Sequence, residues 1–350
     1  MKKLLLSILS DYQKLNLEAD IYIVADAQNR TSKFMPGKIN HADESEFFSR
    51  TEFAEIASAI FNCFGFVRVF YSEIEFIKYI LSNNLNHEEC IVFNFSRDGI
   101  VNGKKSLIPS FCDLLNIKYT GCNAFVISLL RNKHIYTDFL KANNILVPKT
   151  FTYSKKEDIK NIINIFRNQK VIVKNSYESA SIGLTTENII TINSNSYEKL
   201  YQLQRKMKSN ILLIQEFIDG IECEVFVLQY KSKYYALDPV EIIFNSNNNF
   251  IDSITSNTYN YGFKVMDQHL KTTIKNIAIQ SAELLGVKDY ARFDFRIKDN
   301  KAYLIDIAGT PYTIYHSSIA YLFVDFYNLS YKDIYKVLIT CMLSNYKINN

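Results

Sequence analysis

Apolar runs and amphipathic segments alternate along the first 120 residues. Three apolar runs have the continuous character of parallel strands, at residues 20–26, 67–72 and 90–96. Amphipathic segments typical of helices precede, separate and follow them. This alternation predicts an open parallel sheet with helices on both faces. Ligands of such sheets bind beyond the carboxyl ends of the strands, where Arg97 either holds a ligand carboxylate or is a surface arginine at a turn.

The pattern changes after residue 121. We predict one helix over 124–143, ended by Pro148, and then an α+β region. Further strands are expected at 171–176, 188–192, 211–218 and 223–230, and helices at 197–208, 268–285 and 331–344. The polar stretch 244–260 is either disordered or a functional lid. The predicted domains are residues 1–121, 122–210 and 211–350, and the predicted fold class is α/β combined with α+β.

Composition narrows the classes of function. The chain has 350 residues, 48% of them hydrophobic and 22% charged, as in soluble globular proteins. The net charge of +4 is scattered, so no basic stripe indicates a nucleic-acid partner. Six widely spaced cysteines predict free thiols rather than a zinc site or disulfides. No apolar run reaches the roughly 20 residues that span a membrane, so we expect a cytoplasmic protein without a membrane partner.

Residues 290–318 hold the strongest chemical signal. Period-two alternation on both sides of residues 298–301 predicts a β-hairpin. A three- or five-residue loop would place these residues on one face: Arg292, Asp294, Arg296, Leu304, Asp306 and Ala308. Two converging carboxylates suit Mg²⁺ that carries phosphate oxygens. The alternative is an ordinary hairpin whose acidic side chains face water.

Other polar residues precede the hairpin. Lys174 ends a predicted strand and is followed by small residues whose N–H and hydroxyl groups could hold phosphate. Lys133 lies on the predicted helix before it, and Gln215 and Glu222 flank a strand end. Each signal alone is weak, since a lysine at a strand end is usually only solvated.

In this order the motifs resemble the ATP-grasp ligases, specifically the D-alanine:D-alanine ligase-like branch. The resemblance rests on segments spread over nearly the whole chain: IVFNFSRDGIVNGKKSLIPSFCDLLNIKYTG, RNKHIYTDFLKANNILVP, VIVKNSYESASIG, LLIQEFIDGIE, ARFDFRI, LIDIAGTPYTIYHSS and NLSYKDIYKVLI. It implies an ATP-grasp fold with an N-terminal parallel-sheet domain. It also implies ATP and Mg²⁺ as cofactors, a carboxylate and an amine as substrates, and a possible homodimer.

The resemblance assigns roles to individual residues. Catalytic roles fall on Arg292, for the tetrahedral intermediate, and Ser317, for the acceptor carboxylate. The two metal ligands are Asp294 and Asp306. The nucleotide contacts are Lys133, Lys174, Ser181 and Gly183 at the phosphates, Gln215, Glu216 and Ile218 at adenine, and Glu222 at ribose.

Several positions depart from the family pattern. Ala308 replaces a third metal ligand, Ser256 replaces a lid lysine for which Lys264 is a possible substitute, and Tyr312 replaces a glycine on the acceptor side. Ala180 replaces a serine, and residues 26–38 replace the segment that grips the first D-alanine. We therefore expect an acyl-phosphate ligase for other substrates than cell-wall D-Ala-D-Ala. The alternative is a pseudo-ligase that binds nucleotide as a regulatory or scaffold subunit.

Overall fold

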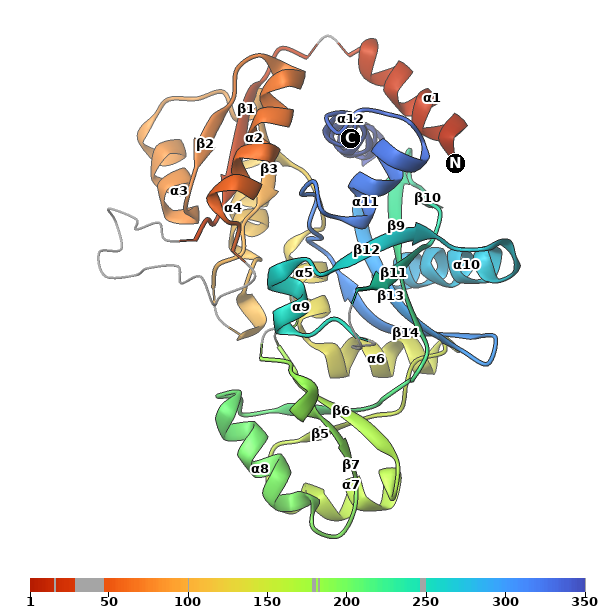
Figure 1. Ribbon diagram of the computed structural model, residues 1–350. Helices are drawn as coiled ribbons and strands as arrows, with labels where there is room; N and C mark the ends of the chain where they lie inside the picture. Colours follow the sequence, from red (N-terminus) through yellow and green to blue (C-terminus); the bar gives the residue numbers. More distant parts are fainter. Residues whose placement is uncertain are drawn as a thin grey trace.

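Four parallel strands form the N-terminal sheet of the computed structural model, in the order β2-β1-β3-β4 (Figure 1). The structure describes residues 1–15, 17–28, 47–99, 101–177, 181, 183–245 and 250–349. The strands are β1 (Asp20–Ala25), β2 (Arg68–Phe70), β3 (Cys90–Phe95) and β4 (Lys118–Tyr119). The predicted parallel sheet is thus confirmed.

Helices cover both faces of this sheet. Alternate residues of β1 point to opposite sides, so Ile21 and Ile23 pack with α2 (Arg50–Phe64), whereas Tyr22 and Val24 pack with α3 (Glu73–Ser82) and α4 (Leu107–Leu115). The core on the α2 side continues into α12 (Asp333–Asn349), against which α1 (Lys2–Gln13) also lies. The first and last helices therefore share one core.

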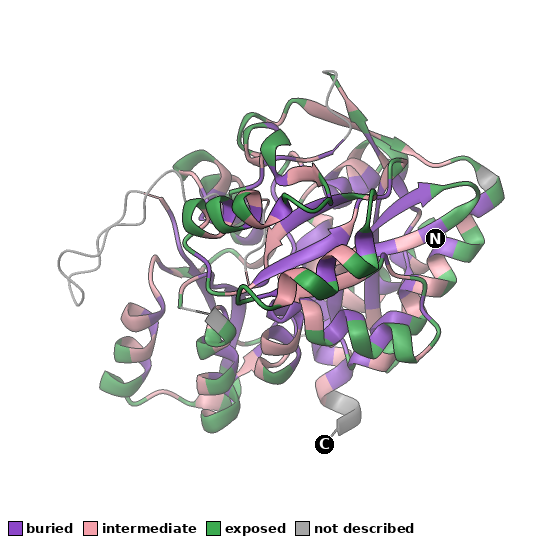
Figure 2. Cartoon of the chain, turned by 90° about the horizontal axis from the view of Figure 1, so that it is seen from below, coloured by how far each residue is buried: buried purple, intermediate pink, exposed green. Residues whose placement is uncertain are grey.

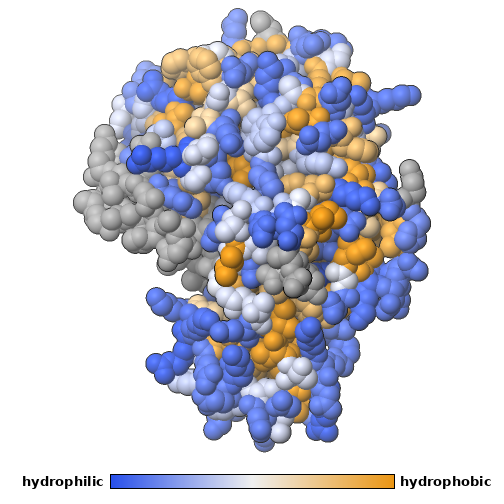
Figure 3. All heavy atoms as spheres, in the orientation of Figure 1, coloured by the Kyte–Doolittle hydropathy of each residue, from blue (hydrophilic) through white to orange (hydrophobic). Residues whose placement is uncertain are grey.

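A second, antiparallel sheet has the order β5-β8-β6-β7 and forms the lower lobe of the molecule in Figures 1 and 3. Its strands are β5 (Thr150–Tyr153), β6 (Lys170–Asn175), β7 (Ile189–Thr191) and β8 (Leu212–Glu216). Helices α7 (Asp158–Phe166) and α8 (Ser196–Lys206) bury Phe166 and Leu200 against it.

The third sheet is antiparallel and carries the predicted hairpin. Its order is β12-β11-β9-β13-β14, and β10 pairs with β9. The strands are β9 (Ile221–Tyr230), β10 (Lys233–Ala236), β11 (Val240–Phe244), β12 (Tyr261–Val265), β13 (Tyr290–Lys298) and β14 (Lys301–Ala308). Figure 2 shows the inner strands buried beneath helices that expose their outer sides.

The two faces of β9 differ. Cys223, Val225 and Val227 pack in the same core as residues of α6 (Lys133–Ala142) and α10 (Gln268–Leu285). On the opposite face, Phe226 joins the core beneath α12, but Glu224 and Glu222, two and four residues earlier, occupy the same face. This face is therefore apolar at one end and charged at the other.

The helix predicted over 124–143 is wrong, and the described part of the polar stretch 244–260 is ordered, which excludes only the disordered alternative there. The single helix expected over 124–143 is two helices, α5 (Ala124–Arg131) and α6, separated at Asn132, where φ is −100° and ψ is 76°. Within the described part of 244–260, the polar stretch holds the short helix α9 (Ser253–Thr258), capped by the Asp252 side chain. Polar capping residues, rather than apolar periodicity, define that helix.

All six cysteines carry free thiols, and five of them are buried. Across the described ranges, no helix has the length and apolar character needed to cross a membrane.

Candidate active site

The hairpin turn has two residues, so the predicted three- or five-residue loop is wrong. Asp299 and Asn300 connect the strands with φ of 49° and 58°, the left-handed values that a tight hairpin turn needs. Nevertheless Arg292 lies opposite Ala308, and Asp294 lies opposite Asp306. The predicted convergence of the two carboxylates is confirmed.

A β-bulge explains this outcome. The register shifts between Asp294 and Phe295, which faces Leu304, so Ile305 is an extra residue in β14. Leu304 is 2% exposed and packs in the core, so its predicted place on the charged face is wrong. The bulge lets Ile305 and Asp306 both line one cavity.

That cavity has a volume of about 440 Å³ and lies between the three sheets. Most of the predicted site residues line it: Lys133, Lys174, Ser181, Gln215, Glu216, Ile218, Glu222, Arg292, Asp294, Asp306 and Ser317. Gly183 lies outside the lining, with a φ of 71°. A cavity of this size, with few polar groups on partly apolar walls, is typical of small-molecule sites.

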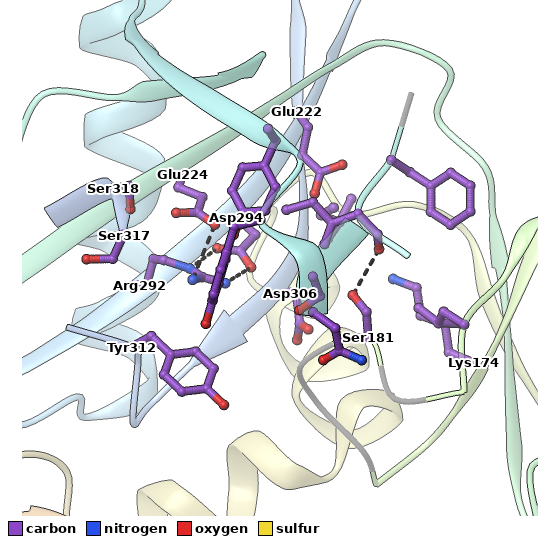
Figure 4. Close-up of a pocket in the computed structure, with 18 of the residues that line it drawn as sticks. Lys174, Ser181, Glu222, Glu224, Arg292, Asp294, Asp306, Tyr312, Ser317 and Ser318 are labelled. Carbon is purple, nitrogen blue, oxygen red and sulfur yellow. Dashed lines mark hydrogen bonds and ion pairs between the residues drawn. The ribbon is translucent and has the colours of Figure 1, made fainter. Parts of the chain in front are cut away.

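Arg292 is the centre of the charged end. Its Nε and Nη2 donate to the two oxygens of Asp294 at 2.7 and 2.8 Å, and its Nη1 is 3.2 Å from Glu224 Oε1. Figure 4 shows Arg292 flanked by these two acids, with Tyr312 and Ser317 nearby. Burial raises the pKa of Glu224 to about 7, although Arg292 opposes the shift. Sequence reasoning missed Glu224, which period two from Glu222 could have revealed.

Asp306 receives two donors. The Lys133 ammonium and the Tyr136 hydroxyl, the latter at 2.9 Å, both donate to its Oδ1. Burial acts to raise the pKa of Asp306, but Lys133 and Lys174 outweigh it and lower the pKa to about 2. Lys133 reaches this carboxylate from the first turn of α6, a position created by the break at Asn132. Asp306 is therefore ionised at neutral pH.

Lys174 lies at the other end of the cavity in Figure 4. Its Nζ donates to Gln215 Oε1 at 2.9 Å, from β6 to the adjacent strand β8. Burial lowers the pKa of Lys174 to about 8, and the positive charge of Lys133 acts in the same direction. Gln215 is 2% exposed, so this hydrogen bond satisfies a buried amide oxygen.

Glu222 and Arg296 form an ion pair of 2.5 Å across β9 and β13. Arg296 Nη1 also donates to the Gly220 carbonyl at 3.2 Å, and the guanidinium lies 5.4 Å from the centre of the Phe217 ring. Burial raises the pKa of Glu222, and the nearby Arg296 opposes this shift. The sequence placed Arg296 on this face but gave it no role.

The segment around α9 is hydrogen-bonded to two described residues that follow β6, Ser181 and Leu184. Ser181, with a φ of 56°, donates through Oγ to the Ile251 carbonyl at 2.9 Å. Ser253 Oγ donates to the Leu184 carbonyl at 2.8 Å. Ser256 lines the cavity from α9. Ala180 and most of the segment 26–38 lie outside the described residues, although Gln28 lines the cavity.

Lys264 does not replace the missing lid lysine, so that hypothesis is wrong. Its side chain is 59% exposed, its nearest carboxylate is Asp267 at 4.0 Å, and it lies outside the cavity lining. The reason is strand alternation, because Tyr261 and Phe263 of β12 face the cavity and Lys264 faces away.

Ser317 caps the short helix α11 (Ser318–Tyr321). Its Oγ accepts from the Ala320 N–H at 3.3 Å and donates to the Ile314 carbonyl at 2.6 Å. The neighbouring His316 packs among Tyr261 and Phe263, with ring centres 5.0 and 5.2 Å away. Burial lowers the pKa of His316, which favours the neutral imidazole. Ser317 and His316 line the cavity, and Ser317 lies beside Arg292 and Glu224 in Figure 4.

Glu216 is the last residue of β8, and Ile218 lies two residues further along the chain. The Glu216 Oε2 accepts from the Lys149 N–H at 3.3 Å, and both residues line the cavity beside Phe217. They surround the end of the cavity that Lys174 and Gln215 occupy.

A parallel-sheet unit beside two antiparallel sheets, with a charged cavity between them, is the architecture of the ATP-grasp fold. Solved structures support this fold. The D-alanine–D-alanine ligase of Bacillus anthracis, solved in complex with ATP, matches with a TM-score of 0.68 at 14% identity, covering 95% of this chain and 100% of that chain. The Coxiella burnetii ligase matches with a TM-score of 0.65 at 13% identity, covering 95% and 97%.

Sequence comparison then identifies the family. The profile described as D-ala D-ala ligase C-terminus matches residues 141–340. The D-alanine–D-alanine ligase of Aquifex aeolicus is 25% identical over 60% of this chain and 68% of its own length, and that of Finegoldia magna is 23% identical over 76% and 75%. The chain belongs to the D-alanine–D-alanine ligase family, and it is an ADP-forming, ATP-dependent ligase by class.

Proposed function

We propose that this protein is an ATP- and Mg²⁺-dependent ligase that activates a carboxylate as an acyl phosphate and joins it to an amine. One observation carries the proposal. Arg292, paired with Asp294, lies on the same sheet face as Asp306, which Lys133 contacts from the facing helix. Such a set of fixed charges suits phosphoryl transfer, in which catalysis consists mainly of positioning and charge stabilisation.

ATP would occupy the long axis of the cavity. Gln215, Glu216 and Ile218 would contact the adenine edge and Glu222 the ribose hydroxyls, a proposal supported by their shared place in the cavity lining. The Gln215 oxygen already accepts from Lys174, but an amide oxygen has two lone pairs and can accept from a second donor. Lys133 and Lys174 would hold the phosphates. Ser181 would contact them from the loop that follows β6.

The proposed reaction has two steps. An oxygen of the substrate carboxylate attacks the γ-phosphorus of ATP, and ADP leaves with the electrons of the broken P–O bond. The amine nitrogen then attacks the acyl carbon, the C–O bond to phosphate breaks, and the nitrogen loses a proton. Arg292 stabilises the oxyanion of the tetrahedral intermediate, and Ser317 orients the amine substrate through its carboxylate.

Asp294 and Asp306 fit Mg²⁺. They face each other across the hairpin, and Asp306 is ionised because its pKa is about 2. No third His, Cys, Asp or Glu completes a metal cluster among the described residues. Mg²⁺ nevertheless binds through one or two carboxylates together with waters and substrate phosphates. When bound, Mg²⁺ neutralises phosphate charge.

The substrates would differ from two D-alanines. Ala308 lies opposite Arg292 and offers no oxygen ligand, Ser256 stands where a cation would face the transferred phosphate, and Tyr312 lines the wall of the acceptor side. These changes reduce the positive charge near the phosphate and alter the shape of the substrate end. They support a ligase outside cell-wall D-Ala-D-Ala synthesis.

The test is phosphate release from ATP with Mg²⁺, measured over pairs of amino acids and small acids. We expect Asp294→Asn to lower turnover on the order of 100-fold or more. The matched control is Asp299→Asn, which removes a carboxylate from the turn of the same hairpin and should keep wild-type turnover. Unchanged turnover in Asp294→Asn would exclude the hairpin as the metal site.

The second candidate is a pseudo-ligase that binds nucleotide as a regulatory or scaffold subunit. The loss of cationic and oxygen groups at Ser256 and Ala308 favours it. ATP binding in calorimetry without phosphate release for any substrate pair would support this candidate and reject the first.

Three further expectations complete the proposal. The chain would divide at residues 121 and 210, although β8 (Leu212–Glu216) pairs with strands of the middle segment. It would act in the cytoplasm, and it would form a homodimer through its N-terminal sheet. Light scattering of the purified protein tests the dimer directly.

A further inference from the structure

A second cavity opens beside the first and is lined by basic side chains. Its volume is about 70 Å³, several times the ~10–15 Å³ that one water needs. Lys133, Arg292 and Tyr312 line both cavities, so the second one adjoins the reacting end of the first. The other basic residues of its lining are Arg97, Lys105 and Arg131. Among the described residues of this lining there is no aspartate or glutamate.

Arg97 is the residue that needs an explanation. It is 2% exposed, so it is not a surface arginine at a turn. Its Nη2 donates to the Thr310 carbonyl at 3.2 Å, and its buried Nε has no hydrogen-bond partner. The guanidinium lies 4.2 Å from the centre of the Tyr312 ring and 4.6 Å from that of Phe48. These rings fix its position, but neither of them neutralises its charge.

Two further basic residues of the lining are buried as well. Lys105 and Arg131 are 5% and 6% exposed, and Arg131 Nη2 donates to the Tyr177 carbonyl. Asp26 is the carboxylate next to Arg97, and its Oδ2 accepts from the backbone N–H groups of Arg97 and Asp98 at 2.6 and 3.1 Å. Asp26 thus positions the backbone that carries the guanidinium. The Arg97 guanidinium itself is buried beside a carbonyl and two rings, and burying such a cation is costly unless an anion joins it.

We propose that this basic cavity, defined by Arg97, Lys105 and Arg131, binds a second anionic group of the carboxylate substrate. The inference rests on the proposed function, because Arg292 and Lys133 place the reacting carboxylate at the entrance of the cavity. The substrate would then be an acidic one, such as an amino acid with a side-chain carboxylate or phosphate. Arg97 would act as a specificity residue and Tyr312 as its support.

The experiment compares substrates that differ in the charge of one group. Phosphate release is measured with both enantiomers of glutamate against glutamine, aspartate against asparagine, and phosphoserine against serine as the carboxylate substrate. We expect kcat/KM to be 10- to 100-fold higher for the anionic member of at least one pair. The pair that responds tells whether the group is a carboxylate or a phosphate.

Arg97→Gln should raise the KM for the anionic substrate 10- to 100-fold, leave the KM for ATP unchanged, and leave the neutral substrate unaffected. Arg97→Lys should restore part of the affinity. The matched control is Arg68→Gln, because Arg68 also stacks on a ring, that of Tyr79 at 4.6 Å, but at an exposed position of β2. A substitution that merely loosened the fold would raise both KM values.

The outcomes separate this inference from the proposed function. Equal turnover of acidic and neutral substrates would overturn the inference while supporting the ligase. If no substrate is turned over, calorimetry of glutarate with the wild type and Arg97→Gln decides. Binding that only the wild type shows supports the basic cavity, and no binding to either protein overturns it. If Arg97→Gln does not fold, the ratio of kcat/KM values that the wild type shows for the anionic and the neutral member of each pair tests the inference.

Discussion

Replacing Lys174 by methionine should stabilise the ligand-free protein while weakening nucleotide binding. A pKa of about 8 in place of the ordinary 10.5 corresponds to at most ~3.4 kcal/mol of unfavourable desolvation, an upper value because the cavity admits water. Methionine removes this cost but leaves the buried Gln215 oxygen without its donor, which costs about 1–3 kcal/mol. The net gain at pH 7 is therefore ~0–2 kcal/mol.

The pH dependence is the diagnostic part of this prediction. Below pH 8 both the folded and the unfolded chain hold the Lys174 proton, so the full cost is present. Between pH 8 and 10.5 the unfolded chain binds more protons than the folded one, so the stability of the wild type rises with pH. The stability of Lys174→Met relative to the wild type should consequently fall by about 2.5 kcal/mol between pH 7 and 10, so that the variant becomes the less stable protein at pH 10.

Urea denaturation of the ligand-free proteins at pH 7, 8, 9 and 10 measures this difference. Lys206→Met is the matched control, because Lys206 pairs with Glu187 on the surface and its side chain is 55% exposed. The difference in unfolding free energy between Lys206→Met and the wild type should not change with pH. Parallel curves for Lys174→Met and the wild type across this range would refute the argument. Calorimetry should show ATP affinity reduced about 10- to 100-fold by the loss of the charged contact.

Three further substitutions test other parts of the site. Gly220→Ala would place a Cβ 2.1 Å from the Ile297 carbonyl oxygen and should lower the free energy of unfolding in urea by ~3 kcal/mol or more. The control is Gly262→Ala, whose Cβ would have nothing within 4 Å and which should change the free energy of unfolding by less than ~0.5 kcal/mol. Glu224→Gln should flatten the fall in stability as pH rises from 4.5 to 7, because the folded protein keeps this proton up to about pH 7; an unaltered slope would contradict the raised pKa. Asp306→Asn leaves its buried lysine partner unpaired and should lower the unfolding free energy by ~3 kcal/mol in the absence of metal, and an unchanged midpoint would show that the pair is not formed.

Period-two patterns predict the faces of the hairpin but not the geometry that produces them. The alternation from Arg292 to Asp294 is local, and it predicts their shared face correctly. The two-residue turn and the bulge at Ile305 compensate each other. Asp299 and Asn300 are residue types that favour such a turn, but the bulge leaves no pattern in the sequence, because it depends on which residues pair across the strands. The correct convergence of Asp294 and Asp306 therefore follows from a wrong loop.

The position of Lys133 shows a second limit. Residues 124–143 have continuous helical periodicity, so periodicity does not predict the break at Asn132. Asparagine is a weak helix former. In the fold, the backbone N–H of Lys133 donates to the carbonyl of Ser176 at 3.4 Å, and Ser176 follows β6 far along the chain. Tertiary contacts of this kind override local propensity. Resemblance, not periodicity, assigns this lysine to the phosphates.

The ionisable groups of the site share one property that explains both the function and the stability of the fold. Burial raises the pKa values of Glu222 and Glu224 and lowers that of Lys174, so burial disfavours the charged forms of all three. The Arg97 guanidinium lies at a similar depth, beside the Thr310 carbonyl and two aromatic rings. In the proposed function, the anionic nucleotide would bring the opposite charge for Lys174, and an acidic substrate would bring it for Arg97. The same buried cations that weaken the empty site would then give the occupied site its affinity and its selectivity.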